Sequence, residues 1–144
     1  MDNNMEKCIY KKVMVVDDSQ IDRFVAEYNL KKYLFAEEII LQNSAKGALE
    51  YLQARMDKPE EIPQFIFLDI RMPEMDGFQF LEEYEKLPEE IQKKCIIMML
   101  SSSLSPDDHE RAEKNRFVSR FLNKPLDIEK LDTLARTIDK KNAA

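Results

Sequence analysis

The chain of 144 residues carries 22 Lys and Arg against 28 Asp and Glu, which gives a net charge of −6 and a pI near 5.0. A chain of this length is expected to fold as one domain with its own core. Its 44% hydrophobic and 35% charged residues are typical of a globular protein and exclude a disordered tail. The acidic balance disfavours direct nucleic-acid binding, which depends on basic side chains that neutralise phosphates.

No segment of the sequence predicts a membrane span or an export signal. The longest apolar run, 95–100, is far shorter than the about 20 residues that a spanning helix needs. The first residues lack the basic and apolar regions of a secretory signal, so we expect a cytoplasmic protein. Cys8 and Cys95 lie far apart in the sequence, and the chain has a single histidine, His109. Neither a zinc site nor a disulfide framework is therefore indicated.

Short apolar runs predict the strands of a buried parallel sheet. Continuous runs of this kind are typical of strands that are covered on both faces. Three strong runs lie at residues 13–16, 65–68 and 95–100, and two weaker ones lie at 39–41 and 117–122. The sequence therefore predicts five strands.

Segments with apolar residues at helical spacing alternate with these strands. The first is Ile21, Phe24, Val25 and Tyr28, a stripe that is expected to face the core. Four further helices are predicted at residues 45–52, 77–84, 106–115 and 128–138. The order βαβαβαβαβα predicts an α/β fold, with helices on both faces of a five-stranded parallel sheet.

The helix predicted at 106–115 differs from the others because Ala112 is its only apolar residue. Ser105 and Pro106 supply its start signals. We expect this helix to be exposed, with His109 on it, and to be anchored weakly. It is then the element most free to move or to meet a partner.

The residues that follow each strand are expected to meet at one rim of the sheet, where such folds bind ligands. They are the carboxylates Asp17, Asp18 and Asp69, the hydroxyl of Ser101 and the ammonium of Lys124. Two carboxylates about 4 Å apart repel by roughly 4 kcal/mol at an effective dielectric of 20, so the cluster needs a cation. Oxygen ligands without histidine or cysteine suit Mg²⁺, with Mn²⁺ as the alternative.

The other donors at this rim suit a phosphoryl group. With a cation on the carboxylates, Lys124 and Ser101 are left to bind phosphoryl oxygens. Aspartyl phosphates are established covalent intermediates. Asp69 is the best acceptor candidate because it ends the most apolar central strand. Asp17 and Asp18 then remain to hold the metal.

The segment that contains Asp69 carries a family resemblance. Residues 68–77 read LDIRMPEMDG and follow the order L-D-x-x-M-P-x-M-D-G. This segment resembles the phosphoacceptor segment of the receiver domains of two-component response regulators. The resemblance extends over residues 12–140 and includes the pair Asp17–Asp18, Ser101 and Lys124-Pro125. It implies a flavodoxin-like (βα)5 receiver fold, with residues 1–144 as a single receiver domain that has no output domain.

The resemblance also implies a mechanism at Asp69. This residue would accept a phosphoryl group from a sensor histidine kinase, from a histidine phosphotransfer protein or from a small phosphodonor. Mg²⁺ would be held by Asp17, Asp18 and Asp69, together with the backbone carbonyl of Arg71.

A conformational switch is implied in the same way. Ser101 and Lys124 would bind the phosphoryl oxygens, Ser101 would move toward them and Phe121 would swing inward. The face formed by the fourth helix, the fifth strand and the fifth helix would then change shape and bind a downstream protein. Phe121 replaces the commoner tyrosine, so a switch that relies on a phenolic hydroxyl is excluded.

The chain departs from the family pattern at other positions. A glycine often occupies the turn before the fifth strand, where this chain has residues 114–116, so Asn115 is expected to supply a left-handed conformation. Arg71 and Ser103 occupy positions that tune dephosphorylation in the family.

Two other functions remain open. A phosphohydrolase or nucleotide-binding protein on a similar sheet is disfavoured, because the glycine-rich phosphate loops are missing and Arg71 stands where a general acid would be needed. A pseudo-receiver that binds its partner constitutively is disfavoured by the complete acidic and basic set. The leading interpretation is a response regulator, not a turnover enzyme, that signals by phosphorylation-controlled protein binding.

Overall fold

The computed structural model describes residues 7–143, and this range contains five parallel strands in the order β2-β1-β3-β4-β5. The strands are β1 (Tyr10–Val16), β2 (Ala36–Gln42), β3 (Phe65–Leu68), β4 (Ile96–Ser101) and β5 (Val118–Asn123). The helices are α1 (Gln20–Lys32), α2 (Ala45–Ala54), α3 (Gly77–Tyr84), α4 (Glu89–Gln92), α5 (Pro106–Lys114) and α6 (Ile128–Ala143), with a 3-10 helix η2 (Pro59–Glu61). The predicted α/β fold is confirmed.

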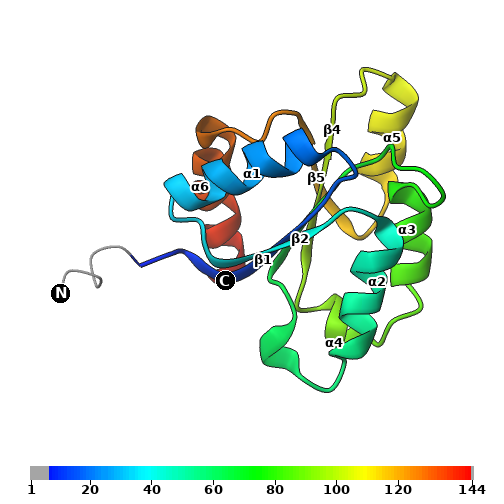
Figure 1. Cartoon of the computed structure of the whole chain (residues 1–144), viewed down its shortest axis with the longest axis horizontal. Helices are drawn as coiled ribbons and strands as arrows, with labels where there is room; N and C mark the ends of the chain where they lie inside the picture. The colour runs from blue at the N-terminus through cyan, green and yellow to red at the C-terminus, as the bar shows by residue number, and fades with distance from the viewer. Residues whose placement is uncertain (1–6, 144) are drawn as a thin grey trace.

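Helices cover both faces of the sheet. Figure 1 shows α1 and α6 on one face and α2, α3 and α5 on the other. The central strand β3 contributes to both cores, since Phe65 and Phe67 pack on the side of α1 and α6, whereas Ile66 and Leu68 pack on the opposite side. All four side chains are fully buried, which explains why this strand reads as a continuous apolar run.

The register of β1 and β3 sets the position of the acidic residues. Val16 is paired with Leu68, so Asp17 and Asp69 each lie one residue beyond the end of their strand. The backbone N–H of Asp69 donates to the carbonyl of Val16 at 2.9 Å. Because side chains alternate between the faces of a sheet, this register places the two carboxylates at one rim.

The prediction for the buried face of α1 is wrong for three of its four residues, whereas the fourth, Val25, is half-buried. Ile21, Phe24 and Tyr28 are 74%, 66% and 54% exposed, whereas the buried side chains are Ala26 and Leu30. An exposed apolar stripe has the same helical spacing as a buried one, so periodicity alone cannot separate them. The helix instead packs through a narrow line of small and aliphatic side chains.

The left-handed conformation predicted for Asn115 is also wrong. Its φ is −79° and its ψ is 125°, which is extended backbone. The side-chain Oδ1 accepts a hydrogen bond from the backbone N–H of Phe117 at 2.9 Å. The carbonyl of Asn115 also accepts from the backbone N–H of Val118 at 3.1 Å, so side chain and backbone close the turn before β5 together without a residue of positive φ.

Two short elements were not predicted. η2 begins at Pro59 and α4 begins directly after Pro88, and each element precedes the start of a strand. They lie at the end of the sheet opposite the rim that carries Asp69 (Figure 1). Within the described range, none of the helices combines the length and the hydropathy needed to cross a bilayer.

Gly77 lets α3 begin directly against the backbone that follows β3. Its N–H donates to the carbonyl of Ile70 at 2.8 Å. A Cβ at this position would lie 2.5 Å from the carbonyl oxygen of Asp69 and 2.9 Å from Cε of Met99. Asp76 caps the helix through a reciprocal pair of hydrogen bonds with Gln79. The first turn of α3 therefore cannot move away from Asp69 without breaking these capping hydrogen bonds.

We predict that Gly77→Ala lowers the free energy of unfolding by about 1–3 kcal/mol, because the added methyl group meets main-chain atoms that cannot move away independently. Urea denaturation measures the change. Gly47→Ala is the matched control, since its Cβ would meet the end of the flexible Gln42 side chain at 2.7 Å. Equal losses in the two variants would contradict the close-approach explanation.

Candidate functional site

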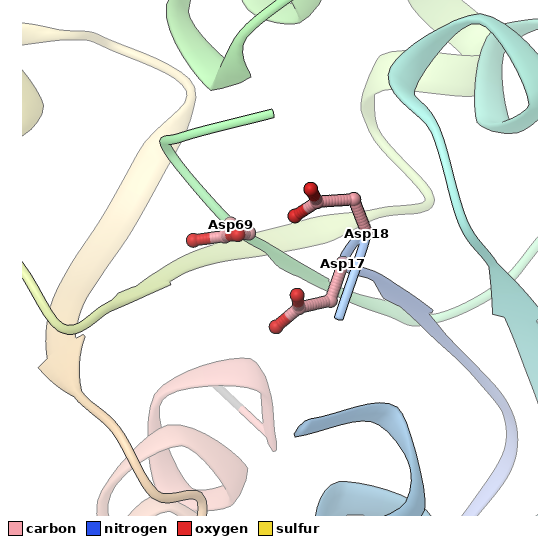
Figure 2. Close-up of side chains that lie close together, drawn as sticks. All are labelled: Asp17, Asp18 and Asp69. Atoms are coloured by element: carbon pink, nitrogen blue, oxygen red, sulfur yellow. The ribbon is translucent and has the colours of Figure 1, made fainter. Parts of the chain in front are cut away.

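Three carboxylates converge at the rim of the sheet. Asp17 and Asp18 follow β1 and Asp69 follows β3, and one oxygen from each lies within 4.8 Å of the others. Figure 2 shows the three side chains pointing into the same space. Asp17 and Asp69 are buried, whereas Asp18 is exposed. The cluster therefore has two desolvated charges and one that solvent reaches.

Lys124 neutralises part of this charge. Its Nζ lies 2.7 Å from Oδ2 of Asp17, 2.8 Å from Oδ2 of Asp22 and 3.4 Å from Oδ2 of Asp69. Three carboxylates thus share one ammonium group. The backbone of Asp17 is held in place as well, because its carbonyl accepts a hydrogen bond from Arg23 at 2.7 Å.

The sequence analysis missed Asp22. This residue lies in the first turn of α1, where its backbone N–H donates to Oγ of the capping residue Ser19 at 3.2 Å. Its side chain turns toward Lys124, 102 residues further along the chain. The available signal was its position three residues after Ser19, in a helix that begins at the rim.

The shortage of positive charge shifts the ionisation of two groups. Burial raises the pKa of Asp69 to about 6, and the neighbouring carboxylates of Asp17 and Asp18 add to this effect, while Lys124 opposes it. Burial alone would lower the pKa of Lys124, but hydrogen bonds to Asp17 and Asp22 and the charge of Asp69 raise it above its usual value. The site therefore favours an additional cation.

The donor set fits a hard divalent cation. The three converging side chains offer only carboxylate oxygens, the ligands that Mg²⁺ and Mn²⁺ prefer. Arg71, whose carbonyl was predicted as a further ligand, lies in the loop after β3, two residues beyond Asp69. Its guanidinium points elsewhere, with Nη2 2.5 Å from Oδ2 of Asp108.

Ser101 lies at the end of β4, next to Lys124. Its side chain is buried, and its Oγ accepts a hydrogen bond from the backbone N–H of Ser103 at 3.0 Å. Its carbonyl accepts from the backbone N–H of Lys124 at 3.0 Å. The register pairs Ser101 with Asn123, so the hydroxyl residue ends β4 and the ammonium residue directly follows the adjacent strand β5.

Phe121 and His109 connect β5 to α5, which is largely exposed and buries few side chains, as expected from the sequence. The half-buried ring of Phe121 contacts the ring of His109, with centroids 3.8 Å apart, so His109 is half-buried on this exposed helix. Besides Ala112, α5 buries the carboxylate of Asp108. The helix is thus held by polar contacts as well as by one apolar residue, which the apolar pattern does not reveal.

Comparison with known proteins agrees with this arrangement. The sequence-family model of the response regulator receiver domain matches residues 13–136 of this chain. The chain belongs to this family. A two-component response regulator from Cytophaga hutchinsonii is 27% identical, with a TM-score of 0.84 over 93% of this chain and 99% of that one. The resemblance inferred from residues 68–77, and the receiver fold that it implies, are confirmed.

Two relatives show receiver sequences in different settings. The chain is 28% identical to the probable methanogenesis regulatory protein FilR2 of Methanothrix harundinacea, over 88% of the chain and 78% of that protein. It is 31% identical to histidine kinase CKI1 of Arabidopsis thaliana, over 91% of the chain but only 12% of the kinase. A receiver domain of this kind therefore occurs both in regulators and within much longer kinases.

The ionisation of Asp69 gives this receiver domain a pH-dependent stability. A carboxyl group with a raised pKa binds its proton more tightly in the folded chain, so its contribution to stability is present below pH 4 and is lost as the pH rises through about 6. We predict that Asp69→Asn, which carries no charge, raises the free energy of unfolding by about 1–3 kcal/mol at pH 7.5.

Urea denaturation of both proteins between pH 4 and pH 8, in a chelator without divalent cations, measures this difference. The advantage of Asp69→Asn should grow between pH 4 and pH 6 and then stay constant. Asp57→Asn, an exposed position outside the cluster, should show no such growth. An advantage of Asp69→Asn that does not change with pH would refute the assignment to Asp69.

Proposed function

We propose that this receiver domain accepts a phosphoryl group on Asp69 and signals through phosphorylation-controlled binding to another protein. The observation that carries the proposal is the buried Asp69 carboxylate at a rim where an ammonium and a hydroxyl residue flank it. Nucleophilic carboxylates of this kind form acyl phosphates. The phosphodonor is the phosphohistidine of a sensor kinase or of a histidine phosphotransfer protein.

The transfer exchanges one phosphorus bond for another. The Asp69 oxygen attacks the phosphorus, the nitrogen–phosphorus bond of the donor breaks and the imidazole leaves, taking up a proton from solvent. The charge at position 69 changes from −1 to −2. Asp17, Asp18, Asp69 and the carbonyl of Arg71 would hold Mg²⁺, or alternatively Mn²⁺, which when bound neutralises carboxylate and phosphoryl oxygens.

Lys124 and Ser101 bind the phosphoryl oxygens in this proposal. The Lys124 ammonium is already 3.4 Å from Asp69, so a small displacement from Asp17 and Asp22 brings it to the new group. The hydroxyl of Ser101 accepts a hydrogen bond from Ser103, which leaves its own hydrogen to donate. Both contacts to a phosphoryl group are charge-assisted, and such hydrogen bonds are stronger than those between neutral groups.

The proposed output surface is the face formed by α5, β5 and α6, which are the fourth predicted helix, the fifth strand and the fifth predicted helix. Phe121 lies on β5 and contacts α5 through His109, so rotation of its ring would alter this face. A downstream protein would bind there, without direct contact to nucleic acid or membrane. We place the protein in the cytoplasm, where kinases that use ATP supply the phosphoryl group.

The apolar stripe of α1 is the proposed contact surface for the phosphodonor protein. Ile21, Phe24 and Tyr28 expose more than half of their surface on the helix that begins beside Asp17. The rings of Phe24 and Tyr28 stack, with centroids 6.5 Å apart. Contiguous exposed apolar side chains mark interaction sites, and a donor that reaches Asp69 must approach this rim.

Labelling with acetyl phosphate tests the acceptor. We predict that the wild-type chain takes up one phosphoryl group per molecule with Mg²⁺, that EDTA prevents this, and that Asp69→Asn abolishes it, because no carboxylate oxygen remains to attack. Asp57→Asn should label normally. Intact-mass spectrometry measures the stoichiometry.

Full labelling of Asp69→Asn would disprove the acceptor assignment. Hydrolysis of more than one equivalent of p-nitrophenyl phosphate per molecule would favour a phosphohydrolase, and failure of the wild-type chain to bind Mg²⁺ in a titration would favour a constitutive pseudo-receiver.

A variant of the α1 stripe separates docking from chemistry. Phe24→Ser should leave labelling by acetyl phosphate unchanged. The donor in the second reaction is a phosphorylated histidine phosphotransfer protein that labels the wild-type chain. Phe24→Ser should slow transfer from this donor about tenfold, since an aromatic anchor contributes about 1–2 kcal/mol or more. Single-turnover transfer of ³²P measures both rates. Lys46→Ser, exposed on α2, is the control. Equal rates for Phe24→Ser and the wild type with the protein donor would remove α1 from the docking surface.

A further inference from the structure

A second charge cluster joins α5 to the loops that follow β3 and β4. Its centre is Asp108, which lies in the first turn of α5 and is only 5% exposed. Oδ2 of Asp108 accepts from Nη2 of Arg71 at 2.5 Å and from Oγ of Ser103 at 2.8 Å. One carboxylate oxygen thus connects the helix to Arg71, two residues after Asp69, and to Ser103, two residues after Ser101.

Few buried side chains attach α5, besides the contacts of His109 with the ring of Phe121 and of Arg111 with the ring of Phe78. Besides Asp108, only Ala112 is buried on α5. A buried carboxylate is tolerated while it is paired and becomes destabilising once its partner is removed. Asp108 therefore anchors α5 while Arg71 is in place, and it disfavours the same position of the helix when Arg71 leaves.

Arg71 is able to leave because its side chain is 65% exposed and belongs to a loop. A guanidinium group binds phosphoryl oxygens with parallel hydrogen bonds, and it does so more strongly than it binds a single carboxylate oxygen. Phosphorylation would add one negative charge to Asp69, two residues away from Arg71. The new charge competes with Asp108 for the same cation.

We propose that Asp108 is a positioning residue that clamps α5 in the unphosphorylated chain, and that a phosphoryl group on Asp69 draws Arg71 away and releases the helix. This inference rests on the proposed function and specifies its regulation. Ser103 joins the same rearrangement, since its N–H donates to Oγ of Ser101 and its hydroxyl donates to Asp108. Movement of Ser101 toward the phosphoryl group would therefore pull on the second hydrogen bond to Asp108.

Hydrogen exchange of the α5 amides tests the clamp. Loss of a hydrogen bond to a charged group corresponds to about tenfold to hundredfold in an opening equilibrium. We expect Asp108→Asn to exchange faster in α5 by this factor without any ligand. Arg71→Gln, a change at an exposed side chain that keeps the fold, should act in the same direction. Asp107→Asn, at the exposed neighbouring position, should exchange like the wild type.

The release is tested with beryllofluoride and Mg²⁺, where beryllofluoride stands in for the phosphoryl group. Binding should accelerate exchange of α5 in the wild type about tenfold or more, and should change it by less than about threefold in Asp108→Asn and Arg71→Gln, where the clamp is already open. The ¹⁹F signal of the bound fluoride reports occupancy separately.

Two results would overturn the clamp: unliganded variants that exchange like the wild type, or a wild-type α5 whose exchange does not accelerate although the ¹⁹F signal shows occupancy. A missing ¹⁹F signal in the wild type instead contradicts the proposed function, and the release step with it. The comparison of unliganded variants still decides whether Asp108 clamps α5.

Discussion

The ammonium group of Lys124 holds three carboxylates together at the rim of the sheet. Asp17 and Asp69 are buried there, and neither has an ammonium or guanidinium partner of its own among the ion pairs of residues 7–143. The strand register fixes the positions of both carboxylates. The apolar cores on the two faces of the sheet stabilise the fold enough to offset the electrostatic cost of the cluster. The excess negative charge thus lies in a rigid part of the molecule, where an additional cation would relieve it.

A second cluster around Asp108 lies one loop further out. The two clusters share no residue, but Arg71 and Ser103 of the outer cluster are each two positions from Asp69 and Ser101 of the inner one. A change of charge in the inner cluster therefore reaches α5 through backbone segments of two residues. Coupling over such a short path needs no long chain of packed side chains. In the proposed clamp, Asp108 and a phosphoryl group on Asp69 compete for the guanidinium group of Arg71.

The sequence predicted the fold and the rim because both depend on local patterns. The continuous apolar run Phe65–Leu68 indicates a strand buried on both faces, and the polar residue that follows it must then lie at the rim. Asp22 and Asp108 were missed as site residues because their partners lie 102 and 37 residues away, and no local pattern reports such a distance. The stripe of Ile21, Phe24 and Tyr28 was assigned to the wrong face because helical periodicity says that a stripe exists, not whether it is covered.

The elements η2 and α4 both lie where strands begin, at the end of the sheet away from the rim. The length of the chain can vary at this end without altering the register that places Asp17 beside Asp69. The exposed segment 56–60 is consequently a suitable place to attach a fluorescent dye or an affinity handle. A reporter placed there would follow the molecule on a surface or in a cell while both charge clusters stay untouched.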